Sequence, residues 1–264
     1  MSSFRSLDTY ALRARLRPAL LVVLPAAALV AGLPAGYSAG WAALWGLITY
    51  SGGTFLLAQF ARDFGRRKQD ALFDDWGGAP TTQRLRHCSD RNSPATVNRY
   101  HQRLEAIIPG LHLPSREEEE ADPDGADQLY QSAVGYLIAR TRDREVFPLV
   151  FEENCNYGFR RNYWGMKALG VSISGLTLVV AASVIAAKVL GAVNFDASLS
   201  ALGAAATVSA LFLYSWLFWV DEEWVRAMGF AYADRLLETC ELLDRVDDQH
   251  LSSLRSAQPG ATQA

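Results

Sequence analysis

Long uncharged stretches alternate with charged ones along this chain. The first uncharged stretch is the longest. Residues 18–61 contain no Asp, Glu, Lys, Arg or His. One membrane-crossing helix takes about 20 apolar residues, so this stretch is long enough for two crossings. Gly and Pro residues between Gly32 and Gly40 favour a turn near its middle. The pattern predicts a transmembrane hairpin whose two helices cover residues 18–34 and 40–60.

A secretory signal peptide is the competing interpretation of the first helix, because four arginines precede its apolar core: Arg5, Arg13, Arg15 and Arg17. A mature secreted protein would continue with a polar segment. Here a second apolar run follows directly, and this favours the hairpin.

A second pair of uncharged segments covers residues 168–187 and 197–220, with Lys188 and a short turn around Asn194 between them. A buried hairpin of a soluble protein is the alternative. Four such segments exceed what the core of a 264-residue soluble protein needs. We therefore predict an all-α membrane protein with four transmembrane helices, arranged as two hairpins, and a mainly helical cytoplasmic domain.

Basic residues flank the predicted helices on one side only. They are Arg5, Arg13, Arg15 and Arg17 before the first helix, Arg62, Arg66, Arg67 and Lys68 after the second, and Arg160, Arg161 and Lys167 before the third. The two short connections carry almost no charge. Since basic flanks stay in the cytoplasm, both termini and the long insert are predicted to be cytoplasmic.

This topology divides the chain into six segments. They are a cytoplasmic N-terminal segment (1–17), a first hairpin (18–61), a cytoplasmic sensing domain (62–167), a second hairpin (168–220), a cytoplasmic C-terminal helix (221–250) and a disordered tail (251–264). The three cysteines all fall in predicted cytoplasmic parts, which indicates reduced thiols: Cys88, Cys155 and Cys240.

Local signals predict several helix boundaries in the cytoplasmic parts. Ser93-Pro94 is typical of a helix start, and Ser115 with Glu118 matches a capping box. Thr81 or Thr82 is expected to cap a helix after the Gly77-Gly78 turn. A further amphipathic helix, with Leu129, Ala133, Leu137 and Ile138 on its apolar face, is expected to run to about Arg144.

Two further expectations concern the ends of the insert. Residues 147–151 are apolar and read as a strand or a buried turn. Nothing between Val220 and Asp221 breaks a helix, so residues 197–248 are expected to form one rod. An apolar stripe on its C-terminal part, from Trp224 to Leu243, is expected to pack on the insert or on a neighbouring subunit.

Arginines and tyrosines of the insert suggest a site for a phosphate-bearing ligand. Arginine forms paired hydrogen bonds with phosphate, and tyrosine can stack on a base. The candidate residues are Arg84, Arg86, His87, Arg99, Tyr100, Tyr157, Arg160 and Arg161. The competing interpretations are that the glycine-rich turn only separates two helices and that Arg160 and Arg161 bind lipid headgroups.

Small residues in the third and fourth predicted helices permit close helix contacts, and so predict self-association. The candidates are Gly170, Ser174, Gly203 and Thr207. No Walker A, H-E-x-x-H or C-x-x-C motif occurs, and the four histidines lack metal-ligand spacing. The sequence therefore predicts no cofactor and no metal, and it argues against an enzyme.

Three motifs of the insert carry a resemblance. They are Trp76-Gly-Gly-x-Pro-Thr-Thr-x-x-Leu-Arg86-His87, then Arg99-Tyr100-His101, and Glu153-Asn-x-x-Tyr-Gly-Phe-Arg-Arg-Asn162 with Gly165-x-Lys167. The insert resembles a family of small bacterial inner-membrane proteins that is largely uncharacterised. The layout is similar to membrane effectors of anti-phage systems, including the Hailong-type effector, which works with a nucleotidyltransferase.

The resemblance implies an inner-membrane effector in anti-phage defence. We expect an oligomeric gated ion channel or membrane-disrupting assembly, controlled by a cytosolic nucleotide-type ligand. Its partners would be the lipid bilayer, further copies of itself, a nucleotide or oligonucleotide, and a cytosolic nucleotidyltransferase. The alternative is a non-conducting membrane scaffold that recruits a cytosolic partner.

Overall fold

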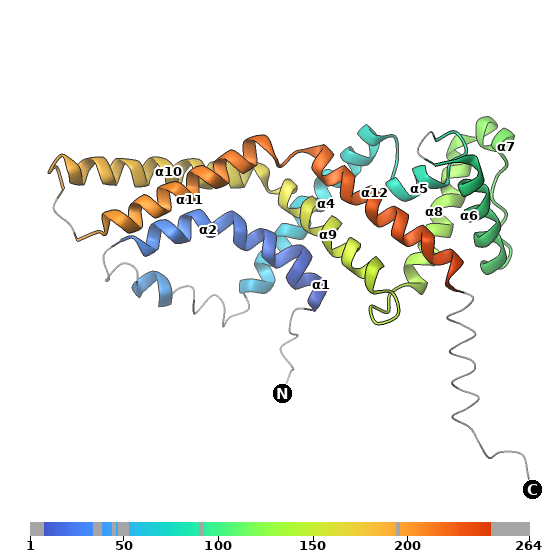
Figure 1. Ribbon diagram of the computed structural model, residues 1–264, viewed down its shortest axis with the longest axis horizontal. Helices are drawn as coiled ribbons and strands as arrows, with labels where there is room; N and C mark the ends of the chain where they lie inside the picture. Colours follow the sequence, from blue (N-terminus) through green and yellow to red (C-terminus); the bar gives the residue numbers. More distant parts are fainter. Residues whose placement is uncertain are drawn as a thin grey trace, which may run out of the picture. The chain divides into compact units, whose positions relative to one another are not determined.

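The structure is a computed structural model that describes residues 8–33, 39–43, 46, 53–89, 92–193 and 196–243. Every regular element in these ranges is a helix (Figure 1). The described residues fall into two compact units. One, called the bundle unit here, draws on Met1–Leu72 and Cys155–Met228. The other, called the insert unit, draws on Phe73–Asn154 and Gly229–Ala264.

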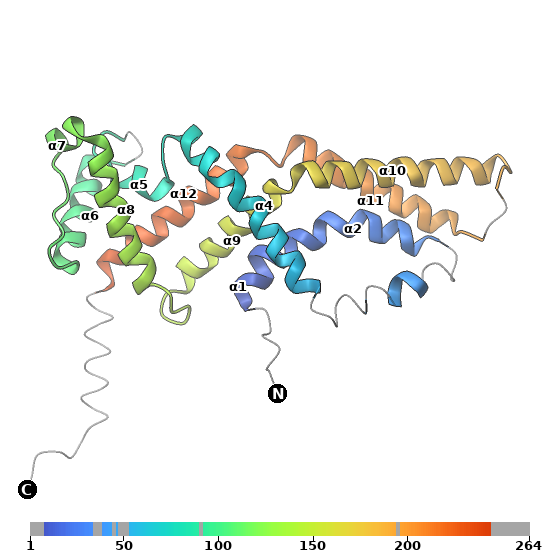
Figure 2. The ribbon, with the colours of Figure 1, turned by 180° about the vertical axis from the view of Figure 1, so that it is seen from behind.

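The bundle unit is built around three helices that lie side by side, α2, α10 and α11 (Figures 1 and 2). Their bounds are Arg17–Ala31, Lys167–Val189 and Leu199–Phe218. Before α2 lie the short α1 (Thr9–Ala11) and a π-helical turn, η1 (Leu12–Leu16). The first part of α4 (Gly53–Trp76), the second part of α9 (Pro148–Gly165) and the first turns of α12 (Glu222–Glu238) also belong to this unit.

Three helical stretches in the described ranges are long and apolar enough to cross a membrane: Thr9–Ala31, Lys167–Val189 and Leu199–Phe218. They match the first, third and fourth predicted membrane helices and are compatible with a multi-pass membrane protein. The second predicted helix, over residues 40–60, lies partly outside the described residues, as does the turn before it. Four crossings and the hairpin pairing therefore stay predictions.

The predicted rod over residues 197–248 is wrong, because the chain breaks between α11 and α12. The helix α11 ends at Phe218, and α12 begins at Glu222. The side chain of Asp221 accepts a hydrogen bond from the backbone N–H of Trp224, at 2.8 Å. Aspartate in that position starts a new helix, and the acidic residues that follow it suit a helix N-terminus.

Over the described residues, the insert unit contains four further helices and the adjoining parts of α4, α9 and α12. They are α5 (Pro80–Leu85), α6 (Pro94–Ile107), α7 (Arg116–Ala121) and α8 (Pro123–Arg140), and a 3₁₀ turn, η2 (Thr239–Glu241), follows α12. Its core joins α6 and α8 to the second half of α12. Leu236, Cys240 and Leu243 of the predicted apolar stripe are buried in this core, so this part of the stripe packs on the insert as expected.

Most of the predicted helix starts are confirmed. Ser93 caps α6 by accepting the N–H of Thr96, at 3.2 Å. Ser115 and Glu118 form the capping box at the start of α7. The helix α8 ends at Arg140 rather than near Arg144, because the next residues form a turn.

Two local predictions are wrong. Neither Thr81 nor Thr82 caps α5, which starts after Ala79 with Pro80 in its first turn and no side-chain cap. Residues 147–151 are neither strand nor buried turn. Pro148 opens α9, since proline suits the first position of a helix, and Phe147 and Val150 bury their side chains in the insert core.

Candidate functional site

The candidate ligand residues of the insert unit lie around α5, and Arg84 is the most fully engaged of them. Its guanidinium pairs with both carboxylate oxygens of Asp234, each at 2.7 Å. A third nitrogen donates to Asn92 at 3.1 Å, and the group lies over the ring of Phe230. Burial raises the pKa of Asp234, and Arg84 opposes that effect. The arginine ties α5 to α12.

Arg86 forms a second paired contact, with Asp127 of α8, at 2.8 and 2.5 Å. The hydrogen bond with Asp127 raises the pKa of Arg86. Arg86 also donates to the carbonyl of Gly77, at 2.6 Å. Gly77 and Gly78 have φ values of 79° and 120°, which favour glycine. A Cβ on Gly78 would lie 2.8 Å from the guanidinium, so the Gly-Gly motif makes room for this arginine.

His87 belongs to a buried hydrogen-bond cluster around Glu119. Glu119 is only 4% exposed. Glu119 accepts hydrogen bonds from the O–H of Tyr130 at 2.6 Å, from the N–H of His87 at 2.9 Å and from the N–H of Cys88 at 3.1 Å. Burial raises the pKa of Glu119, but these hydrogen bonds outweigh it, and the net shift is downward. The cluster fixes the end of α5 to α7 and α8.

The imidazole of His87 has its own partner. Its Nε2 lies 3.1 Å from the carbonyl oxygen of Pro114. A carbonyl can only accept, so this nitrogen carries the proton. His101 is placed in the same way, 2.7 Å from the carbonyl of Leu85, and burial lowers its pKa. Both rings serve the packing of the insert unit.

The guanidinium of Arg99 lies over the ring of Tyr100, 5.8 Å from its centroid. Arg99 is exposed and donates to Glu241 at 2.6 Å. Tyr100 is buried in the insert core. The candidate arginines of this unit, Arg84, Arg86 and Arg99, thus each pair with a carboxylate. A phosphate ligand would have to displace that carboxylate.

A cavity of about 390 Å³ lies beside Arg86, and its lining is mainly acidic. The lining residues are Arg86, Cys88, Glu119, Glu120, Pro123, Asp124 and Asp127. Four carboxylates against one guanidinium make this cavity acidic, so a phosphate could bind Arg86 only by displacing a carboxylate from it. Within the described ranges, no cluster of His, Cys, Asp and Glu side chains is arranged to hold a metal ion.

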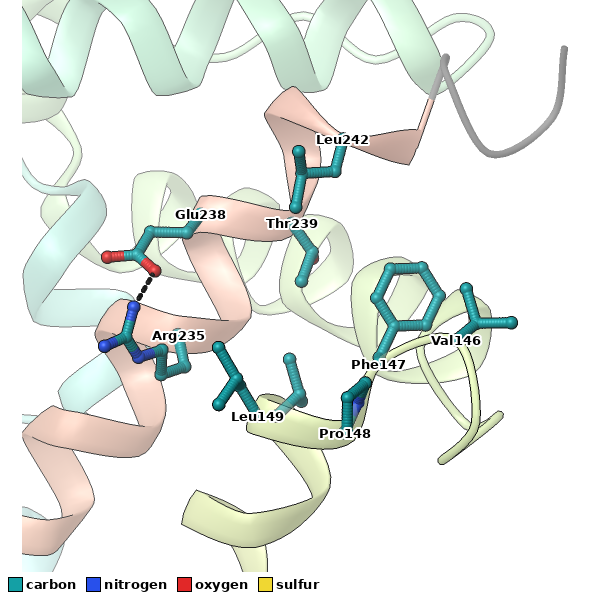
Figure 3. Close-up of a pocket in the computed structure, with 9 residues that line it drawn as sticks. Val146, Phe147, Pro148, Leu149, Arg235, Glu238, Thr239 and Leu242 are labelled. Atoms are coloured by element: carbon teal, nitrogen blue, oxygen red, sulfur yellow. Dashed lines mark hydrogen bonds and ion pairs between the residues drawn. The ribbon is translucent and has the colours of Figure 1, made fainter. Parts of the chain in front are cut away.

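The insert unit also carries a shallow apolar groove between the start of α9 and the end of α12 (Figure 3). Leu149 and Leu242 line it and are exposed. The ion pair between Arg235 and Glu238, at 2.7 Å, lies at its edge. Side chains of this kind suit an apolar partner surface better than a charged small molecule.

In the bundle unit, Asn162 of α9 joins three helical segments, and it is fully buried. Its side-chain amide donates to the carbonyl of Ala14 in η1, at 2.6 Å. In an α-helix this carbonyl would accept from residue 18, but Pro18 has no N–H. The chain widens into the η1 turn at this point, and Asn162 supplies the missing donor.

Glycines let the backbones of this junction approach closely. A Cβ on Gly65 of α4 would overlap Oδ1 of Asn162 and lie 3.0 Å from its Cα. A Cβ on Gly165 would lie 2.8 Å from the backbone of Gly65. A Cβ on Gly158 would lie 2.9 Å from the Cβ of Ala14. We call the meeting of η1, α4 and α9 at Asn162 the junction.

The basic residues next to the junction bind protein groups. Arg160 donates to the carbonyl of Trp224 at 2.8 Å and lies over its ring, at 4.7 Å. Lys167 donates to the carbonyl of Val220 at 2.7 Å. Both cations therefore hold the break between α11 and α12. Arg161 donates to the side chain of Gln69 on α4.

Tyr157 lies on the same helix, under the guanidinium of Arg161, at 5.6 Å from it. The tyrosine is buried, and burial raises its pKa to about 12. Its ring is covered by the protein, so no open face is left for a base. In this structure Tyr157, Arg160 and Arg161 serve the packing of the bundle unit.

The predicted helix-packing residues fall into two groups. Gly170 and Ser174 are buried inside the bundle. The ring of Trp216 packs on Gly170, where a Cβ would lie 2.7 Å from Nε1, and on Tyr163, whose ring centroid is 3.9 Å away. Gly203 and Thr207, on α11, have another environment. A Cβ on Gly203 would meet nothing within 4 Å, and Thr207 is exposed.

No protein-family model, curated protein or solved structure matches this chain. The resemblance to bacterial inner-membrane effectors thus stays a prediction. Sequence reasoning missed the partners of the arginines and the role of Asn162. Pro18, directly after a run of arginines, was the one local signal that a carbonyl near Ala14 needed a donor from elsewhere.

Proposed function

We propose that this chain is a membrane effector whose bundle conducts ions or disrupts the bilayer as a homo-oligomer, under the control of the insert unit. The observation that supports it is the course of α9. This helix contributes Val150 to the core of the insert unit and Tyr163 to the core of the bundle unit. In this proposal, α9 transmits a change in the packing of the insert core to the junction and to Trp216.

The surface of the bundle supports the membrane part of the proposal. The side chains that α10 and α11 expose are predominantly large and apolar, and they suit lipid or another protein copy. They include Leu176, Val179, Val189, Leu211, Leu217 and Phe218. The open position at Gly203 and the exposed Thr207 next to it offer a close-contact face for a second copy.

The control step in this proposal is an exchange of anions. A phosphate that reaches Arg84 or Arg86 replaces Asp234 or Asp127 as the partner. The replacement would release α5 from α12 or from α8, because these pairs join the helices. A nucleotide-type ligand has the required chemistry. The bacterial inner membrane, cytoplasmic termini, a nucleotidyltransferase partner and anti-phage defence follow from the sequence expectations and complete the proposal.

The test is ion flux through liposomes that contain the purified full-length chain. ATP and cyclic nucleotides are added as probes at low and high salt. Flux that a nucleotide changes in the wild type, and does not change in the Arg84→Ala/Arg86→Ala variant, is the expected result. Binding should also weaken with salt, as phosphate contacts do. A wild-type protein with no flux under any of these conditions would count against a channel.

A non-conducting scaffold is the second candidate function, and the apolar groove beside Leu149 and Leu242 is the observation that favours it. A scaffold would give no flux in liposomes. The variant Leu149→Asp would then abolish recruitment of a cytosolic partner to the membrane fraction and leave the amount of membrane-bound chain unchanged.

A further inference from the structure

Several of the residues that α10 and α11 bury in the bundle are small or polar. The buried residues of α10 are Gly170, Ser174, Thr177 and Ala181, and those of α11 are Leu202, Ala205, Ser209 and Trp216. The two helices pack against each other. We call the line of buried residues between them the seam.

Two polar atoms of the seam lack a hydrogen-bond partner among the described residues: Oγ of Ser174 and Nε1 of Trp216. Both residues are 0% exposed. Other hydroxyls of the bundle behave differently. Ser209 donates to the carbonyl of Ala205 at 2.7 Å, and Thr207 donates to that of Gly203 at 3.0 Å. Such bonds to the preceding turn are the ordinary solution for a serine or threonine inside a helix.

Both unpaired atoms belong to residues on the seam side of α10 or packed against it. Nε1 of Trp216 lies against Gly170, and Ser174 is one turn further along the same face of α10. An unpaired buried polar group costs about 1–3 kcal/mol. The hydrocarbon core of a bilayer has no partner to offer. Water can both donate and accept a hydrogen bond, so it is the kind of partner that suits both atoms.

We propose that the seam is hydrated at Ser174 and Trp216 and is the path by which water and a small monovalent cation enter the bundle. This inference rests on the proposed conducting function, since it assigns the path to the inside of one protomer. The outer faces of α10 and α11 would then be left for lipid and for neighbouring copies.

The test compares two Ser→Cys substitutions on α10, Ser174→Cys in the seam and Ser172→Cys on the exposed side. They differ in depth by only about 3 Å, at 1.5 Å per residue. The full-length chain, with Cys88→Ser to remove its exposed thiol, is placed in liposomes and treated with Ag⁺. Free thiols are then alkylated in denaturant, and the peptides are identified by mass spectrometry.

We expect Ag⁺ to bind the cysteine at position 174, and so to block its later alkylation, at least about ten-fold faster than it does at position 172. A thiol reacts as the thiolate, and it ionises only where water is present. Equal rates, a faster reaction at position 172, or no reaction at either position would contradict the proposal that the seam is hydrated. Labelling is read independently of flux. Labelling at 174 without any flux would leave the seam in place and reject the conducting function.

A second measurement covers the case in which the Ser174→Cys variant does not fold. If the seam is dry, Ser174→Ala removes an unpaired hydroxyl and should raise the Tm in detergent. If the seam is hydrated, the same change should leave the Tm unchanged or lower it. Ser209→Ala, whose hydroxyl is paired within α11, is the control for loss of a buried hydroxyl. A Tm increase that is specific to Ser174→Ala contradicts the proposal.

Discussion

The crossing of α4 and α9 at Gly65 offers a sharp test of the junction. A methyl group at this position would overlap Oδ1 of Asn162 and lie 3.0 Å from its Cα. Forcing one extra carbon into packed protein costs about 1–3 kcal/mol. For a chain of this size each kcal/mol corresponds to roughly 2–4 °C in Tm, so Gly65→Ala should lower the Tm by roughly 2–12 °C.

The effect of Gly65→Ala should depend on Asn162, because that side chain supplies the overlapping atom. Asn162→Ala alone removes the buried hydrogen bond to the carbonyl of Ala14, at a cost of about 1–3 kcal/mol. In the double variant the overlap with Oδ1 no longer exists. The loss should therefore be smaller than the sum of the two single losses, by about 1 kcal/mol.

The assay is the fraction of the full-length chain that stays monodisperse in detergent after heating. Two glycines serve as controls. Gly175→Ala should change the Tm little, since a Cβ there meets nothing within 4 Å. Gly165→Ala should lower the Tm and show no rescue by Asn162→Ala, because its Cβ would meet the backbone of Gly65. Strictly additive losses for Gly65→Ala and Asn162→Ala would refute the geometry of the junction.

Three further predictions test other parts of the molecule. A probe cysteine at Asn194 should react with an impermeant reagent outside spheroplasts, and one at Asp124 should not; the reverse pattern would invert the topology. Gly203→Leu should lower the oligomer mass in detergent and leave the Tm of the protomer unchanged, since that position is open within the protomer; an unchanged mass would exclude this contact face. The pKa of Glu119 is lowered in the folded protein, so its contribution to stability is present above the unfolded value of about 4.3 and is lost as the pH falls below it. Melting curves should therefore show a smaller loss between neutral and acid pH for Glu119→Gln, and an identical loss would contradict the hydrogen-bond cluster.

Local signals in the sequence were sufficient for the features that depend on neighbouring residues. The caps at Ser93 and Ser115 act over three residues, and both are confirmed. Three of the predicted membrane helices depend only on the length and composition of one segment, and the structure has helices at these places. The break before α12 was equally local. Asp221, followed by two glutamates, is typical of a helix start. The apolar residues up to Val220 favoured one continuous helix instead.

The junction is different, because it depends on contacts between distant segments. Asn162 and Ala14 are separated by 148 positions. Pro18 shows from the sequence alone that one carbonyl lacks its helical donor. It does not show which of the polar residues of the chain replaces that donor. The glycines of α9 were visible as small residues, but their partners at Gly65 and Ala14 come from the packing of α4 and η1.

The arginines explain why the ligand site was the least predictable part. A guanidinium forms the same paired hydrogen bonds with a carboxylate of its own chain and with a phosphate. The partner of Arg84 is 150 positions away and that of Arg86 is 41 positions away, so no local pattern separates the two cases. The pairs with Asp234 and Asp127 are therefore compatible with a purely structural role and with a resting state that a phosphate opens. Lysine in place of Arg86 would keep the charge and lose the paired geometry. Loss of nucleotide-dependent flux in Arg86→Lys, with a folded protein, would separate a ligand contact from charge alone.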